Sequence, residues 1–172
     1  MKNSLYYIMV VSFFVFVACK ANKIHLNSFK KTECPYLASC NTSLSLNKSL
    51  LIQEEKLTQL PYPQIVEGES MVIHFTYEKV SPDGISDGGL TETLFFEIPQ
   101  NTDYLHLKDQ ELQSIKLLWG QHCFCPDAGY FPVSIGEALI EKHKDTLYFE
   151  IQFKIEGIHP VVSRVSEKIE IK

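Results

Sequence analysis

The stretch TLYFEIQFKIEG, residues 146–157, decides the fold, because apolar and polar side chains alternate along it without a break. Its apolar positions are Leu147, Phe149, Ile151, Phe153 and Ile155. A period of two over this length predicts an antiparallel strand with one face against a core and the other in water. The polar residues 143–145 before it predict a turn, so that residues 136–157 form a hairpin.

Similar patterns recur along the chain. Residues 70–80 (SMVIHFTYEKV) alternate in the same way, with His74 on the solvent face. Residues 41–55 predict a short hairpin turned at Asn47–Lys48–Ser49, and residues 62–70 an edge strand or loop. Further strands are predicted at 90–99, 121–125, 130–133 and 163–172, and a short helix at 109–117. Eight or nine short strands predict an all-β antiparallel β-sandwich, immunoglobulin-like or transthyretin-like, with a small closed β-barrel as the alternative.

Composition sets limits on the class of protein. The chain has 172 residues, of which 45% are hydrophobic, enough for the core of one domain. The formal net charge is −5, so the chain lacks the basic surface that nucleic-acid binding requires. No nucleic-acid partner is therefore expected.

The N-terminus carries the most specific motif. A single Lys precedes an apolar run from Leu5 to Ala18, which is short for a membrane span and typical of a signal peptide. The run ends in FVAC, residues 16–19, with a small residue before Cys19. This resembles the lipobox of bacterial lipoproteins, in which the peptidase cuts before the cysteine and a lipid is attached to it.

That resemblance implies an organisation for the whole chain. Residues 1–18 would be a signal peptide, residues 19–33 the lipidated Cys19 with a tether, and residues 34–172 one β-sandwich domain. Lys20 does not resemble the Asp that retains lipoproteins in the inner membrane, which favours the outer membrane. The body is similar in general character to small Bacteroidota lipoproteins of unknown function. An ordinary secretory signal, with Cys19 not lipidated, is the alternative.

Four further cysteines, Cys34, Cys40, Cys123 and Cys125, predict two disulfides in an oxidising compartment. On an extended strand, the Cα atoms of residues 123 and 125 would lie roughly 6.6 Å apart, at the upper limit of disulfide geometry. We therefore expect crossed pairing, with Cys34 and Cys40 each bonded to one of the later pair. Each crossed bridge would contribute about 4 kcal/mol in the chain-entropy model.

The stretch WGQHCFCPDAGYFPV, residues 119–133, is the main candidate for a site. Trp119, Tyr130 and Phe131 are aromatic residues beside turns, which indicates a binding surface, with core packing as the alternative reading. His122 together with Cys123 and Cys125 could instead bind copper or support redox chemistry, because thiolate and imidazole suit that metal. Their spacing does not match a thioredoxin motif.

The sequence contains no recognisable catalytic motif. Glu92 and Glu97 are an odd number of residues apart on one strand, which places them on opposite faces. The loop at 81–89 carries Asp83 and Asp87, too few carboxylates for a calcium loop. We therefore expect no cofactor and a non-enzymatic, membrane-anchored lipoprotein that acts as a binding or assembly module of the cell envelope, with a protein or glycan partner. Alternatives are a glycan-binding or enzyme-inhibitor lipoprotein and a copper- or redox-handling periplasmic protein.

Overall fold

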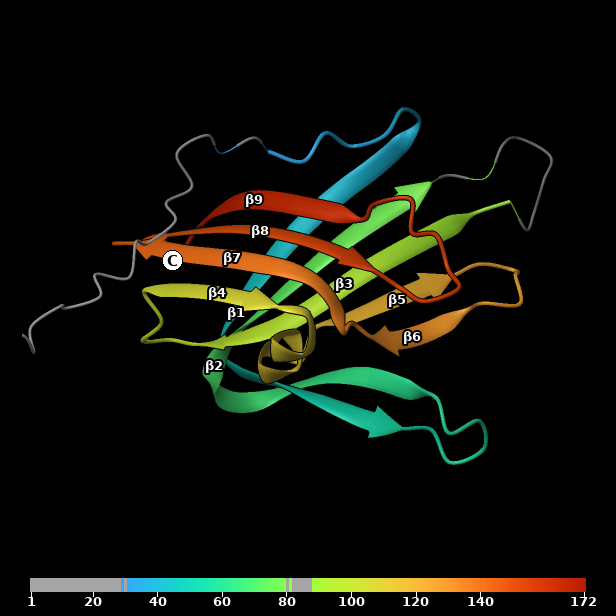
Figure 1. The fold of residues 1–172 in the computed structure, drawn as a ribbon, viewed down its shortest axis with the longest axis horizontal. Helices are drawn as coiled ribbons and strands as arrows, with labels where there is room; N and C mark the ends of the chain where they lie inside the picture. Colours follow the sequence, from blue (N-terminus) through green and yellow to red (C-terminus); the bar gives the residue numbers. More distant parts are fainter. Residues whose placement is uncertain (1–28, 30, 80, 82–87) are drawn as a thin grey trace, which may run out of the picture.

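The computed structural model describes residues 29, 31–79, 81 and 88–172, which fold into two antiparallel β-sheets packed face to face (Figure 1). The first sheet has five strands in the order β1-β2-β3-β5-β6, namely β1 (Ala38–Glu54), β2 (Pro61–Lys79), β3 (Leu90–Pro99), β5 (Leu118–His122) and β6 (Gly129–Pro132). The second has four strands in the order β4-β7-β8-β9, namely β4 (Tyr104–Lys108), β7 (Ile135–His143), β8 (Thr146–Lys154) and β9 (Arg164–Glu170). A 3₁₀ helix, η1 (Asp109–Ile115), leads from β4 to β5.

The main core lies between the two sheets. The alternating apolar side chains of β8, from Leu147 to Phe153, are buried there together with Ile155, which follows the strand. The five-stranded sheet contributes a matching inward face that includes Phe75, Phe96 and Trp119. Phe96 meets Phe149 edge to face, with ring centroids 5.1 Å apart. The predicted all-β sandwich is confirmed. No closed barrel forms from the described strands, so that alternative is wrong.

The predicted hairpin at 41–55 is wrong. Residues 38–54 form one strand, β1, which pairs with β2 along its whole length, and residues 62–70 belong to β2 rather than to a separate strand. Asn47 has a φ of 55°, and the register shifts between Leu46 and Lys48. A single left-handed residue makes a bulge that bends both strands without reversing the chain. The predicted helix at 109–117 is present as the 3₁₀ helix η1.

The bend creates a third layer. Beyond the bulge, residues 48–54 of β1 and 61–67 of β2 continue as a two-stranded ribbon, which we call the arm (Figure 1). Leu50 of the arm is buried in a second apolar cluster with Val72, Phe95 and Leu118, which lie on the outer face of the five-stranded sheet. The arm therefore packs on the sheet face that points away from the main core.

Candidate functional site

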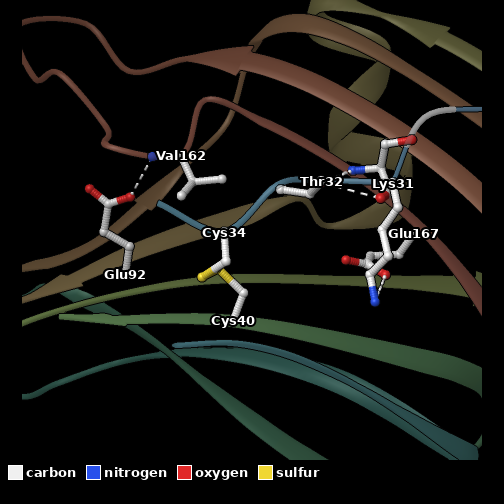
Figure 2. Close-up of a disulfide and its surroundings, with 8 residues drawn as sticks. Lys31, Thr32, Cys34, Cys40, Glu92, Val162 and Glu167 are labelled. Atoms are coloured by element: carbon white, nitrogen blue, oxygen red, sulfur yellow. Dashed lines mark hydrogen bonds and ion pairs between the residues drawn. A yellow bond between two sulfur atoms is a disulfide. The ribbon is translucent and has the colours of Figure 1, made fainter. Parts of the chain in front are cut away.

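The two disulfides are local, and the predicted crossed pairing is wrong. Cys34 bonds to Cys40, with Cα atoms 5.7 Å apart (Figure 2). Cys123 bonds to Cys125, with Cα atoms 5.2 Å apart. The chain turns at Tyr36–Leu37 and brings Cys34 back to the start of β1. Residues 123–125 form a bend after the end of β5 and not part of an extended strand, so their Cα atoms come close enough to pair.

The aromatic residues of the 119–133 stretch separate onto the two faces of the sheet. Trp119 points inward, is buried in the main core and packs beside Phe131, with ring centroids 5.9 Å apart. Trp119 therefore does not belong to the exposed binding surface that the sequence predicts. Phe131 is half-buried against the same core. Tyr130 lies half-buried on the outer face.

Tyr130 lies directly over Gly120. A Cβ atom on Gly120 would be 2.5 Å from the tyrosine ring, so the absence of a side chain at this position allows the ring to lie on β5. Tyr130 also extends a row of rings across the outer face: His74 stacks on Phe95 at 4.0 Å, and Phe95 meets Tyr130 edge to face at 6.3 Å. His122 meets the other side of Tyr130 at 5.0 Å.

The surroundings of the two histidines in this row disfavour their charged forms. Burial lowers the pKa of both His74 and His122, and burial raises the pKa of the Tyr130 hydroxyl. His74 Nε2 lies 3.1 Å from the Thr76 hydroxyl, and His122 Nε2 lies 3.1 Å from the Tyr130 hydroxyl. His74 is thus on the outer face, as predicted, although the stacked ring of Phe95 covers part of it.

The copper or redox alternative for His122, Cys123 and Cys125 does not match this geometry. Both sulfur atoms form the disulfide and accept N–H contacts from Gln121, at 3.4 and 3.2 Å. His122 instead contacts Tyr130. Throughout the part of the chain that the structure describes, no three His, Cys, Asp or Glu side chains are grouped so that they could hold a metal ion.

Exposed apolar side chains lie in three loops along one end of the five-stranded sheet, from the turn before β1 at one edge to the arm tip at the other (Figure 1). They are Tyr36, Leu37, Leu57, Leu60 and Phe124, which we call the distal rim. Tyr36 and Leu57 are each 90% exposed, and Phe124 is 88% exposed.

Several pairings place these side chains at the same end. The start of β1 pairs with the end of β2, which pairs with the start of β3, and β5 ends beside both β3 and β6. The tip of the arm reaches this end as well, because Leu60 Cδ1 would lie 3.6 Å from a Cβ on Gly129. Figure 1 shows the arm tip and the β5–β6 loop on the same side of the molecule. The sequence analysis assigned neither a strand nor a site to residues 55–60, so it did not identify Leu57 and Leu60 as exposed side chains of this end.

Phe29, the first described residue, lies toward the opposite end. Its ring meets Tyr148 edge to face at 5.6 Å, near the start of β8. Lys31 then pairs with Glu167 at 3.4 Å, and the Thr32 N–H donates to the Ser166 carbonyl at 2.8 Å. The last residues of the predicted tether therefore run along β9 before the Cys34–Cys40 loop begins (Figure 2).

Glu92 joins the two sheets at the distal end. Glu92 is only 2% exposed, and its carboxylate accepts the N–H group of Val161 at 2.7 Å and that of Val162 at 3.0 Å (Figure 2 shows the bond to Val162). Burial raises the pKa of Glu92, and the two N–H groups act against that rise. Glu97, on the other face as predicted, pairs with Lys116 at 2.6 Å and accepts the N–H of Leu50. One glutamate holds the β8–β9 loop and the other holds the arm, so both have structural partners.

A cleft of about 370 Å³ lies between the N-terminal segment and the start of β9. It is lined by residues 31–33, Pro35, residues 161–164 and Ser166. The Ser166 side chain is 2% exposed, and its hydroxyl has no hydrogen-bond partner among the described residues. Thr93 Oγ1 and Trp119 Nε1 are also buried without a partner, but of the three residues only Ser166 lines this cleft, which makes the cleft a second candidate site.

Comparison with protein-family models, with curated proteins and with solved structures finds no match to this chain. Over the described residues, no helix has both the length and the apolar character needed to cross a bilayer. Cys19, Asp83 and Asp87 lie outside the described residues.

Proposed function

We propose that this protein is a non-enzymatic lipoprotein of the bacterial cell envelope that binds a partner protein through the distal rim. The lipid would be attached to Cys19, and we propose the outer membrane as its location. The FVAC motif supports the anchor. The binding role is supported by one observation above all: three separate loops along one end of the five-stranded sheet carry five exposed apolar side chains.

The construction of the rim favours binding. Tyr36 and Leu37 lie inside the loop closed by Cys34–Cys40, and Phe124 lies between Cys123 and Cys125. Short closed loops restrict their side chains before a partner arrives, which lowers the entropy cost of binding. Burying one Phe or Leu side chain in an interface contributes about 1.5–3 kcal/mol. Several such side chains together would form the apolar centre of a protein interface.

The position of the rim relative to the anchor supports the same function. Phe29 is ten positions after Cys19, a span of at most about 35 Å when fully extended. Phe29 packs near the start of β8, whereas the rim lies beyond the other end of that strand. A lipid on Cys19 would therefore be attached through the end of the domain opposite the rim, which leaves the rim accessible to another envelope component.

A glycan-binding or enzyme-inhibitor lipoprotein is the second candidate. The observation in its favour is that two aromatic side chains, Tyr36 and Phe124, are exposed at the same end of the molecule. Flat aromatic rings provide contact area to sugars as well as to proteins. The copper- or redox-handling alternative requires free thiols at Cys123 and Cys125, and we do not propose it.

In-cell photo-cross-linking tests the binding role. A photoreactive amino acid is placed at Phe124 in one strain and at Lys144, in the turn between β7 and β8, in another. We expect Phe124 to cross-link to one discrete envelope protein, and Lys144 not to do so. Leu57→Asp should weaken the cross-link from Phe124. Equal cross-linking from both positions would contradict a binding rim, and binding to a purified glycan without any protein cross-link would favour the second candidate.

The anchor is tested separately by metabolic labelling with a palmitate analogue. We expect the protein to incorporate the label and Cys19→Ser to lose it. If the wild-type protein stays unlabelled, the signal is an ordinary secretory one, while the binding proposal for the rim is unaffected.

A further inference from the structure

Strand β9 is an edge strand of the four-stranded sheet, and the hydrogen bonds around it fix which of its backbone groups point outward. Phe153 N–H donates to Ser163 O at 2.9 Å, and Ile171 N–H donates to Asp145 O at 2.8 Å. The odd-numbered residues of β9 therefore bond to β8, and the even-numbered residues point away from it. Arg164 and Ser166 thus present their N–H and C=O groups to the free edge.

The N-terminal segment already uses part of this edge. The Thr32 N–H donates to the Ser166 carbonyl at 2.8 Å, and the Ser166 N–H donates to the Thr32 hydroxyl at 2.6 Å. Thr32 therefore pairs with β9 much as an added strand would. Beyond Ser166, the same edge continues to Arg164 along the cleft of about 370 Å³. This volume is within the range of small-ligand sites.

Both walls of the cleft are held in place. On one side, the Cys34–Cys40 disulfide fixes the segment that contains Pro35 (Figure 2). On the other side, the Glu92 carboxylate holds Val161 and Val162 through their backbone N–H groups. Because its walls are already fixed, the cleft loses little conformational entropy when a ligand binds.

The chemistry of the lining fits an uncharged backbone better than an anion. The cations at the mouth are already paired: Lys31 with Glu167 at 3.4 Å, and Arg164 with Glu150 at 2.6 Å. What the cleft offers is the outward backbone of Arg164, apolar surface from Pro35 and two valines, and the unpartnered hydroxyl of Ser166. These are the groups that an extended peptide with small apolar side chains would satisfy.

We propose that the cleft binds an extended segment of a partner polypeptide by strand addition to the free edge of β9. The backbone of the bound segment pairs with Arg164, the next outward-facing residue of β9 after Ser166, with which Thr32 pairs. One carbonyl group of the bound segment accepts a hydrogen bond from the Ser166 hydroxyl. This site is separate from the distal rim and does not depend on the lipid anchor, so it can fail while the proposed function stands.

A library of random nine-residue peptides displayed on phage provides the probe. Peptides are selected on the full chain in detergent, and the best binders are synthesised. Val161→Lys places a long charged side chain at the cleft, and Ile135→Lys is its control, because the two native side chains are similarly exposed, at 48% and 43%. We expect Val161→Lys to abolish binding and Ile135→Lys to leave it unchanged.

Two further measurements distinguish strand addition from other binding. Ser166→Ala removes only the buried hydroxyl and should weaken binding by about three- to tenfold, the value of one hydrogen bond. N-methylation of the peptide should abolish binding at alternate positions only, and the Arg164 amide should exchange its hydrogen at least about tenfold more slowly in the complex.

Three outcomes would overturn the proposal. One is that no selected peptide loses binding with Val161→Lys. Another is that binding tolerates N-methylation at every position, which would exclude backbone pairing. The third is that the affinity falls with Phe124→Asp and not with Val161→Lys, which would assign the peptide to the distal rim.

Discussion

The adjacent leucines Leu50 and Leu51 give a direct test of how the arm is held. Leu50 is fully buried in the cluster on the outer face of the five-stranded sheet, whereas Leu51 is 42% exposed on the opposite face of the arm. The backbone of Leu50 is also fixed on both sides, because its N–H donates to Glu97 Oε2 at 2.6 Å and its carbonyl accepts Lys116 Nζ at 2.8 Å.

Leu50→Ala removes three carbon atoms from this cluster, a loss of about 2.4 kcal/mol in transfer free energy, and leaves a cavity as well. We expect the free energy of unfolding to fall by about 3 kcal/mol for Leu50→Ala and by less than about 1 kcal/mol for Leu51→Ala. Urea denaturation measures the difference. Hydrogen exchange should show that Leu50→Ala exposes the amides of residues 48–67 first, while the amides of β8 stay protected. Equal losses for the two variants would refute the docked position of the arm.

Three other predictions concern the backbone, a buried carboxylate and the disulfides. Gly136→Ala should lower the free energy of unfolding by about 3–5 kcal/mol, because φ is 145° and the new Cβ would lie 2.2 Å from the Gln152 carbonyl oxygen. Gly157→Ala should lower it by only about 1 kcal/mol, because φ is 75° and no atom lies within 4 Å of the new Cβ. Urea denaturation measures both values. Burial raises the pKa of Glu92, so ionisation of Glu92 penalises the folded state as pH rises above 4.5, the ordinary value for glutamate. Glu92→Gln should therefore gain stability relative to wild type as pH rises above 4.5, and a difference that does not change with pH in thermal denaturation would contradict this. Peptide mapping without reduction should recover only the two local disulfide linkages, and full reduction should lower the free energy of unfolding by about 2 kcal/mol for each bridge, because each closes a short loop.

The sandwich could be predicted from the sequence because period-two alternation is a direct consequence of burying one face of a strand. The arm could not be predicted by the same rule. Asn47 reads as a turn residue in sequence, and only the pairing of β1 with β2 shows that it makes a bulge. A usable signal was nevertheless present: Met71–Val72–Ile73 and Leu94–Phe95–Phe96 are apolar on consecutive positions. Consecutive apolar residues indicate a strand that is covered on both faces.

The cysteines show a different limit of sequence reasoning. Their number predicted two disulfides, but the connectivity depended on the assumption that residues 123–125 are extended. The chain bends there, so the spacing argument against a local bond did not apply. Among the aromatic residues of the 119–133 segment, the sequence did not distinguish buried from exposed positions: Trp119 faces the core, and Phe124 is 88% exposed.

The local connectivity also changes what the disulfides do. A crossed pair would close loops of more than eighty residues and contribute mainly to global stability, about 4 kcal/mol for each bridge. Bridges with sequence separations of 6 and 2 constrain the denatured chain much less. Their main effect is on the loops themselves, which contain Tyr36, Leu37 and Phe124. A domain that already buries a large core needs no such bridge to fold, but exposed apolar side chains need a rigid support if they are to bind a partner at low entropic cost. The positions of both disulfides therefore indicate that they hold the exposed side chains of the rim in place rather than stabilise the core.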